Sequence, residues 1–264
     1  MKKRLDLILF ENGFFETKSL AAAQILAGNV KIGDKVVTKA GELYNPEKLL
    51  DPEAKEKIEV KTMPFVSRGG LKLHHAIKEF KINLKDKICI DMGASTGGFT
   101  DCMLQAGAKK VYAVDVGHNQ LAWKLREDNR VVVKEKTNVK NCAFEEIFDC
   151  ESLEDDLMPE FMSMDLSFIS ITKVLENILN FIKKDSLMVF LIKPQFEAEK
   201  NEIQKGGVVK DEKIHQKIIE NIKAFASNFD LETIGVIKSP IQGAKQGNTE
   251  YLICLKRGNG LCQQ

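Results

Sequence analysis

Seven strand-like segments alternate with helix-like segments over most of this 264-residue chain, from Lys87 to near its C-terminus. The strand-like segments are short and apolar, and they cover residues 87–92, 110–115, 131–135, 161–166, 187–192, 231–237 and 249–255. The helix-like segments between them cover residues 98–107, 119–128, 171–183 and 211–227. This alternation predicts right-handed βαβ units, and therefore an α/β fold with a seven-stranded, mostly parallel sheet. The last two strands are close enough in sequence to pair as an antiparallel hairpin.

Residues 1–62 have a different pattern, which predicts a small α+β module of two helices and a small sheet. Thr17 or Ser19 can cap a helix that runs through Ile25 and Leu26, and Gly28-Asn29 can end that helix. Two short strands then flank Gly33-Asp34, which is a hairpin signal. The module has 11 Lys and Arg against 10 Asp and Glu, so a basic face can arise only from the placement of its charges.

The segment 63–80 joins this module to the larger domain, which we expect to cover residues 81–264. Pro64 breaks regular structure, and Arg68-Gly69-Gly70 predicts a turn. Residues 71–80 then have the pattern of a helix. The alternative interpretation is that this turn is only a flexible hinge between the two modules.

The composition excludes several classes of protein. Lys and Arg number 39 against 38 Asp and Glu, so no overall charge favours a nucleic-acid partner. No cysteine belongs to a CxxC pair and only four histidines are present, so we expect no metal site. Unpaired cysteines are typical of proteins in a reducing cytoplasm, which is where we expect this protein. The basic start of the chain is a poor signal peptide, and the longest apolar run, at 187–192, is too short to span a bilayer. The cysteines are Cys89, Cys102, Cys142, Cys150, Cys254 and Cys262.

The segment IDMGASTGGFT, at 90–100, places a glycine-rich turn directly after a strand-like run. A phosphate-binding P-loop would end in Gly-Lys-Ser/Thr, but Phe99 follows Gly98 here. A dinucleotide loop would have a second glycine two residues after Gly93, and that position is Ser95. The remaining common ligand for such a turn is S-adenosylmethionine, whose carboxylate suits a helix N-terminus. The residues expected to hold it in this turn are Gly93, Ala94, Ser95, Thr96, Gly97 and Gly98.

Three further polar residues belong to the same predicted cofactor site. Asp91 precedes the turn and suits the ammonium of S-adenosylmethionine, directly or through water. Asp115 ends the next strand, where a carboxylate can accept both ribose hydroxyls. Asn138 follows the third strand and could line the adenine side, which is the weakest of the three assignments.

Two charged residues mark the expected chemical centre. Asp165 ends the fourth strand of the sheet and Lys193 ends the fifth, where Pro194 stops the strand. Ligands bind at the carboxyl edge of a parallel sheet, and a lysine beside an aspartate there favours function over packing. A confined lysine can take the proton of a weakly acidic hydroxyl or stabilise its oxyanion. The segment after the fourth strand, DLSF, contains neither the Asn/Asp-Pro-Pro-aromatic turn of adenine methyltransferases nor the cysteine of cytosine-C5 enzymes.

The chain also resembles a known family over nearly its whole length. The segments SRGGLKL, DMGASTGGFTDCMLQAGAKKVYAVDVGHNQLAWKLREDNRV, MDLSFIS, LIKPQFE, KGGVV and GNTEYL are similar, in this order, to those of the TlyA family. Members join an S4 domain to an FtsJ-like, Rossmann-like methyltransferase domain that uses S-adenosylmethionine. The resemblance implies methylation of the ribose 2′-OH of cytidine in ribosomal RNA. It also implies a catalytic tetrad of Lys72, Asp165, Lys193 and Glu250.

Residues 3–61 resemble the S4 RNA-binding domain, which implies that its helix pair and hairpin dock on RNA. The basic residues expected to take part are Lys3, Arg4, Lys18, Lys31, Lys35 and, outside the module, Arg68. Two other functions remain as alternatives at this point. One is a non-catalytic RNA-binding or ribosome-assembly factor, and the other is a membrane-active haemolysin, a label that the family has carried. The sequence leaves the oligomeric state and the modified nucleotide open.

Overall fold

A computed structural model describes residues 2–15, 17–51, 53–54, 57–60, 63–204, 206–243 and 247–258. The chain divides into two compact units, Met1–Met63 and Pro64–Gln264, each with its own hydrophobic core. The second unit includes the segment 64–80, which the sequence assigned to a linker and a first helix. Among the described residues, no helix combines the length and the apolar character that crossing a bilayer requires.

The first unit contains the two helices, the hairpin and the closing strand that its sequence predicts. The Thr17 hydroxyl caps the second helix by accepting a hydrogen bond from the Leu20 amide at 3.1 Å, and Gly28 follows its end with a φ of +73°. The sequence did not predict the short pairing of β1 with β4, nor α3. The elements are β1 (Lys3–Arg4), α1 (Leu5–Glu11), α2 (Lys18–Leu26), β2 (Val30–Ile32), β3 (Lys35–Val37), β4 (Leu43–Tyr44), α3 (Pro46–Leu49) and β5 (Ile58–Val60).

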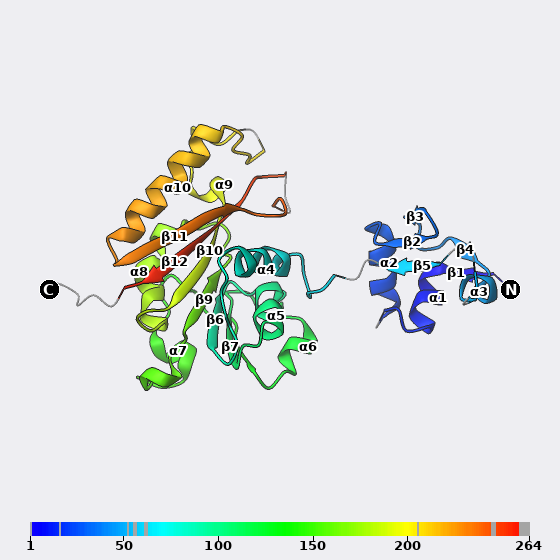
Figure 1. Cartoon of the computed structure of the whole chain (residues 1–264), viewed down its shortest axis with the longest axis horizontal. Helices are drawn as coiled ribbons and strands as arrows, with labels where there is room; N and C mark the ends of the chain where they lie inside the picture. The colour runs from blue at the N-terminus through cyan, green and yellow to red at the C-terminus, as the bar shows by residue number, and fades with distance from the viewer. Residues whose placement is uncertain are drawn as a thin grey trace. The chain divides into compact units, whose positions relative to one another are not determined.

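The second unit is built on a seven-stranded sheet in the order β11-β12-β10-β9-β6-β7-β8 (Figure 1). β12 pairs antiparallel with both of its neighbours, and the pairs among β10, β9, β6, β7 and β8 are parallel. The predicted mostly parallel sheet and its final antiparallel hairpin are therefore confirmed. The strands are β6 (Ile88–Met92), β7 (Lys110–Val114), β8 (Val131–Lys134), β9 (Phe161–Met164), β10 (Leu187–Ile192), β11 (Leu231–Lys238) and β12 (Tyr251–Arg257).

Helices cover both faces of this sheet. Apolar residues of α4 (Gly69–Glu79) and α5 (Gly98–Gln105) pack in the core on one face, together with Leu125 of α6 (Trp123–Arg126). The other face is covered by α7 (Phe144–Phe148), α8 (Leu175–Ile178) and α10 (Glu212–Ser227). The remaining short elements are η1 (Asp155–Leu157), η2 (Ile171–Lys173), η3 (Leu179–Phe181) and α9 (Pro194–Glu197).

Two of the predicted helices are shorter than their sequence pattern suggested. The segment 119–128 contains only the four-residue α6, and the segment 171–183 is a series of short turns, η2, α8 and η3. In both segments most apolar residues still face the core, although Trp123 is 72% exposed, so the sequence pattern indicates burial and not a continuous helix.

The order of the strands defines where a ligand can enter the sheet. From β6 the chain moves outward to β7 and β8, and it then returns to place β9 on the other side of β6. The loops that follow β6 and β9 therefore diverge at the carboxyl ends of these two strands and leave a crevice between them. In α/β sheets this switch point is the usual ligand site. The glycine-rich turn follows β6 and Asp165 follows β9, so both flank the crevice.

Candidate active site

Three of the four charged residues predicted at strand ends follow their strands directly. Asp115 follows β7, Asp165 follows β9 and Lys193 follows β10. These strands run parallel within one sheet, so the three side chains lie at the same carboxyl edge. The structure thus brings them together as the sequence predicts.

Asp91 is placed differently, inside β6 instead of at its end, with no exposed surface. Its two carboxylate oxygens accept hydrogen bonds from the hydroxyls of Thr100, at 2.7 Å, and Ser163, at 2.8 Å. Burial raises the pKa of Asp91 to about 6, although these two hydrogen bonds oppose the shift. Asp91 lines neither of the two hollows described below, so its role toward the cofactor ammonium stays a prediction.

The three glycines of the turn after β6 are each required by packing of protein against protein. A Cβ at Gly93, whose φ is +88°, would lie 2.7 Å from the backbone oxygen of Asp165. A Cβ at Gly97, whose φ is +93°, would lie 2.2 Å from Leu125, and one at Gly98 would lie 2.3 Å from the Ser67 hydroxyl oxygen. The sequence pattern indicated that these glycines let a ligand approach the backbone. The structure adds a second reason, which is the close packing of other protein atoms around them.

Two adjoining hollows open at the crevice and share Gly93, Ser95, Asp165 and Ser167. The larger has a volume of about 480 Å³ and includes Asp115 and Asn138 in its lining. The smaller has a volume of about 290 Å³ and is lined by Ala94, Thr96 and Gly98 from the turn and by Lys72 and Lys193 from the predicted tetrad. We call them the β7-side hollow and the tetrad hollow.

Asp115 connects the glycine turn to the loop after β7. One carboxylate oxygen accepts a hydrogen bond from the Ser95 amide at 2.8 Å, and the other accepts one from the Gly117 amide at 2.7 Å. Each oxygen has a second lone pair that can still accept a hydrogen bond from the hydroxyl of a ligand in the β7-side hollow. Asp115 therefore has both a structural and a ligand-facing position.

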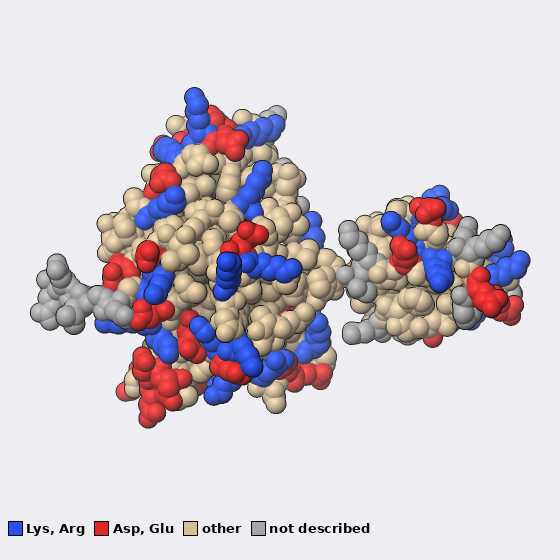
Figure 2. All heavy atoms as spheres, viewed as in Figure 1, with Lys and Arg blue, Asp and Glu red and all other residues tan. Residues whose placement is uncertain are grey.

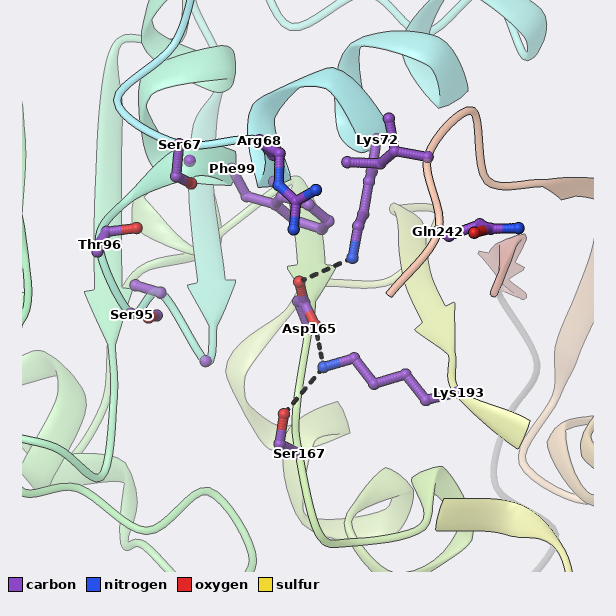
Figure 3. A pocket seen from close by; sticks show the side chains of 15 residues that line it. Ser67, Arg68, Lys72, Ser95, Thr96, Phe99, Asp165, Ser167, Lys193 and Gln242 are labelled. Carbon is purple, nitrogen blue, oxygen red and sulfur yellow. Dashed lines mark hydrogen bonds and ion pairs between the residues drawn. The ribbon is translucent and has the colours of Figure 1, made fainter. Parts of the chain in front are cut away.

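The four residues of the predicted tetrad lie together, although they are far apart in the sequence. The Lys72 Nζ donates a hydrogen bond to the Glu250 Oε2 at 2.7 Å and lies 3.9 Å from the Asp165 Oδ2. The Lys193 Nζ lies 2.6 Å from the Asp165 Oδ1. Figure 3 shows both lysines directed at Asp165, Lys72 from above and Lys193 from the lower right. Two positive and two negative charges thus alternate in one chain of contacts.

The Asp165 Oδ1 is held by an ion pair with Lys193. The Asp165 Oδ1 is buried and accepts no hydrogen bond within the described part of the chain, because the short approach of Lys193 is off the hydrogen-bond direction. The Lys193 Nζ instead donates a hydrogen bond to the Ser167 hydroxyl at 3.0 Å (Figure 3). The charge of the buried Asp165 Oδ1 is therefore compensated by Lys193, and the Ser167 hydroxyl fixes the position of that lysine.

Several residues of the tetrad hollow were not singled out from the sequence. Ser167 lies in the quoted segment MDLSFIS, two residues after Asp165, and this spacing is a signal that could have found it. Ser67, Phe99 and Gln242 also line the hollow, and nothing in their local pattern distinguishes them. Arg68, predicted to bind RNA, is exposed and lines the same hollow, where Figure 3 shows its side chain near Lys72.

The basic residues predicted to bind RNA in the first unit fall into two groups. Lys3 pairs with Glu11 at 2.9 Å, Arg4 pairs with the buried Asp6 at 2.7 Å, and Lys35 pairs with Glu42 at 2.9 Å. Lys18 and Lys31 are exposed and form no ion pair with the described residues. On the face drawn in Figure 2, basic and acidic side chains are interspersed, as the balanced composition implies.

Comparisons with known proteins place this geometry in a family. The FtsJ-like methyltransferase family matches residues 65–257, and the S4 domain family matches residues 3–49. The 16S/23S rRNA (cytidine-2′-O)-methyltransferase TlyA of Mycobacterium tuberculosis is 36% identical over 255 residues, which are 97% of this chain and 90% of that protein. The chain belongs to the TlyA family of FtsJ-like methyltransferases. The resemblance read from the sequence motifs is therefore confirmed.

Other members of the TlyA family carry a different name. Hemolysin A of Brachyspira hyodysenteriae is 44% identical over 250 residues, which are 94% of this chain and 98% of that protein. A solved structure of a Streptococcus thermophilus protein described as a hemolysin is 38% identical and has a TM-score of 0.72, with 98% of this chain and 90% of that chain covered. Similar TlyA-type chains thus carry both an enzyme name and a haemolysin name.

Proposed function

We propose that this protein transfers a methyl group from S-adenosylmethionine to the ribose 2′-OH of cytidine in ribosomal RNA. The observation that carries the proposal is the cluster of Lys72, Asp165, Lys193 and Glu250 at the switch point, beside the glycine turn. A relative named as an rRNA (cytidine-2′-O)-methyltransferase supports the choice of substrate. Because ribosomal RNA is a cytoplasmic molecule, the proposal also places the protein in the cytoplasm.

The residues at the crevice fit S-adenosylmethionine. The β7-side hollow, at about 480 Å³, lies within the range of roughly 300–1,000 Å³ that small-molecule sites occupy. Asp115 would accept the ribose hydroxyls, and Asn138 would face the adenine. The amides of the glycine turn and the start of α5 would face the carboxylate. When bound, the cofactor supplies an electrophilic methyl group on its sulfonium.

The tetrad would act on the hydroxyl that receives the methyl group. Asp165 would hold and orient Lys193 beside the 2′-OH. Lys193, which lies 2.6 Å from the Asp165 Oδ1, would take the hydroxyl proton as a neutral amine or, as an ammonium, stabilise the negative charge that develops on the oxygen. Lys72 and Glu250 would hold Asp165 from its other side and add a compensating pair of charges.

The position of Arg68 supports an RNA substrate. Its guanidinium is exposed at the tetrad hollow, where it could bind a phosphate next to the extruded nucleotide. The S4 domain would hold a folded element of the same RNA. The target nucleotide would have to leave its stack, because a paired helix leaves no room for an in-line approach to the 2′-oxygen. A non-catalytic RNA-binding role would not need the cluster of Lys72, Asp165, Lys193 and Glu250.

The decisive experiment removes one oxygen atom from the substrate. Ribose methylation is first mapped in ribosomal RNA that has been incubated with the protein and labelled S-adenosylmethionine. An RNA fragment that contains the mapped nucleotide is then made with a 2′-deoxy sugar at that position, and a control fragment carries the deoxy sugar at the next nucleotide. We expect methyl incorporation to vanish in the first fragment and to persist in the control.

The outcomes distinguish the alternatives. Methylation that continues on the deoxy nucleotide would move the reaction to the base and contradict the role given to the tetrad. Binding of ribosomal RNA without any methyl transfer to it would instead favour the non-catalytic factor.

A further inference from the structure

The loop after β7 forms one wall of the β7-side hollow. Val116 and Gln120 line the hollow, and Val116 is 69% exposed. Asn119 has a φ of +54°, a left-handed conformation that a residue other than glycine adopts at a cost. Such a conformation persists only when its surroundings hold it, so the contacts that hold this loop determine the shape of the hollow.

Glu135 supplies most of those contacts. It directly follows β8, the strand next to β7, and its side chain is 10% exposed. Its Oε2 accepts a hydrogen bond from the Asn119 amide at 2.8 Å and lies 3.2 Å from the His118 Nδ1. Its Oε1 accepts one from the Gln120 amide at 3.1 Å and one from the Arg126 guanidinium. Both oxygens are thus engaged by this one loop and the helix that follows it.

The same loop is tied to the residues expected to bind the cofactor. The Gly117 amide donates a hydrogen bond to Asp115, and a Cβ at Gly117 would lie 2.2 Å from the Gln120 Nε2 and 3.0 Å from the Asp115 Oδ1. The Ala122 amide donates a hydrogen bond to the Thr96 carbonyl of the glycine turn at 3.1 Å. A shift of residues 118–120 would therefore move Gln120 at the wall of the β7-side hollow and disturb the contact of Ala122 with the glycine turn.

The electrostatics of Glu135 agree with a permanently ionised anchor. Burial raises the pKa of Glu135, but hydrogen bonds from the Asn119 and Gln120 amides and from Arg126 outweigh burial and lower it to about 2. A carboxylate that accepts this many donors has little capacity left for a ligand. Although Glu135 lies at the carboxyl edge of the sheet, it therefore acts on the ligand site through the loop that it holds and not by binding the ligand itself.

We propose that Glu135 is a positioning residue, which sets the affinity for S-adenosylmethionine by fixing the 117–121 loop against Asp115. The inference rests on the proposed function, because it assigns the nucleoside end of the cofactor to the β7-side hollow. Glu135 does not touch the cofactor or the reacting atoms. It determines the shape of the cofactor-binding wall and leaves the tetrad, in the other hollow, unchanged.

The test compares Glu135→Gln with the unsubstituted full-length protein. Glutamine keeps the size of the side chain but replaces one acceptor oxygen by an NH₂ group, which would face donors of the loop or Arg126. We expect the Kd for S-adenosylmethionine, measured by calorimetry, to rise at least tenfold. In methyl transfer from labelled S-adenosylmethionine to ribosomal RNA, the KM for the cofactor should rise similarly. The kcat at saturating cofactor should stay within twofold.

Glu127→Gln is the matched control. Glu127 is exposed at the end of α6, and the same chemical change there removes no described contact with the loop. We expect its cofactor Kd to stay within twofold. An unchanged Kd in a folded Glu135→Gln protein would overturn the inference, and so would a fall in kcat without a change in Kd.

A measurement on the unsubstituted protein covers the case in which Glu135→Gln fails to fold. Hydrogen exchange of the amides in segment 117–121 should slow when S-adenosylmethionine binds, together with those of the glycine turn. Protection of the turn alone would overturn the inference. If the unsubstituted protein does not bind S-adenosylmethionine at all, the proposed function fails first, so the two failures are distinguishable.

Discussion

The Lys193 Nζ lies 2.6 Å from the Asp165 Oδ1, and the two residues directly follow neighbouring parallel strands. Their backbones are fixed by the sheet, so the contact is determined by strands that are buried on both faces. A site on such rigid elements holds its geometry more precisely than one on a mobile loop. Substitutions of Lys193 should therefore report on chemistry with little effect on folding.

Lys193→Ala should abolish most methyl transfer while S-adenosylmethionine still binds. The lysine lies at the tetrad hollow and not at the β7-side hollow, so its loss removes a group next to the acceptor oxygen. Loss of a general base or of one oxyanion contact costs on the order of 10²–10⁴ in rate. Single-turnover methyl transfer and calorimetric cofactor binding would be measured together. Near-normal turnover would contradict the assignment.

Lys193→Arg separates the two roles that Lys193 could have. Arginine keeps the positive charge but cannot act as a base, because its guanidinium stays protonated. If Lys193 takes the hydroxyl proton, the arginine variant should be as inactive as Lys193→Ala. Recovery of more than a tenth of the activity would instead show that the positive charge is sufficient. The pH dependence of the single-turnover rate would check the result.

The pair of Lys72 and Glu250 should be required for stability as well as for activity. Lys72→Met removes the cation that lies 2.7 Å from Glu250, whose side chain is only 3% exposed. An unpaired buried charge costs roughly 3–5 kcal/mol in the free energy of unfolding. The double variant Lys72→Met with Glu250→Gln removes both charges, so it should regain most of that stability and no activity. Equal stability of the single and double variants in urea unfolding would refute this account.

The sheet and its charged edge could be predicted from sequence because both depend on short-range patterns. Short, mostly apolar runs of four to six residues mark the buried strands, and the residue after each run lies at the carboxyl edge. Asp115, Asp165 and Lys193 were found in this way. Lys72 and Glu250 were not, because they are separated by 178 residues, and only the family resemblance joined them.

The placement of Asp91 and of the short helices shows where local patterns fail. Sequence spacing puts Asp91 near the end of a strand, but it does not reveal that Thr100 and Ser163 occupy both of its oxygens. In the segment 171–183, apolar residues at helical spacing indicate burial, yet the backbone forms separate turns. Both errors come from tertiary contacts, which one segment alone cannot report.

Asp91 should make stability depend on pH in an unusual direction. Burial raises its pKa from 3.8 to about 6, so the folded state binds the proton more tightly than the unfolded state does. Its contribution is therefore complete below about pH 4 and is lost as the pH rises to about 6. Two pKa units correspond to about 3 kcal/mol.

Asp91→Asn should remove this dependence. An asparagine can accept a hydrogen bond from one of the two hydroxyls and donate one to the other, so the variant should be more stable than the original protein at pH 7. Near pH 4 the two should be similar. Urea unfolding at both pH values measures the difference between the two proteins, which cancels the other carboxyl groups. A difference that does not change with pH would contradict the pKa assigned to Asp91.

The first unit should be required for RNA binding and dispensable for cofactor binding. The chain divides after Met63, and each unit has its own hydrophobic core, so a protein that begins at Met63 should fold. It should bind S-adenosylmethionine with the Kd of the full chain and lose most of its affinity for ribosomal RNA. Phosphate contacts make RNA affinity fall steeply with salt, so the truncated protein should also show a shallower dependence on salt concentration.

A full-length protein with Lys18→Glu and Lys31→Glu should lose part of the affinity, because both lysines are exposed and form no ion pair with the described residues. Equal RNA affinity of the full and truncated proteins across a salt series would rule out docking by this unit.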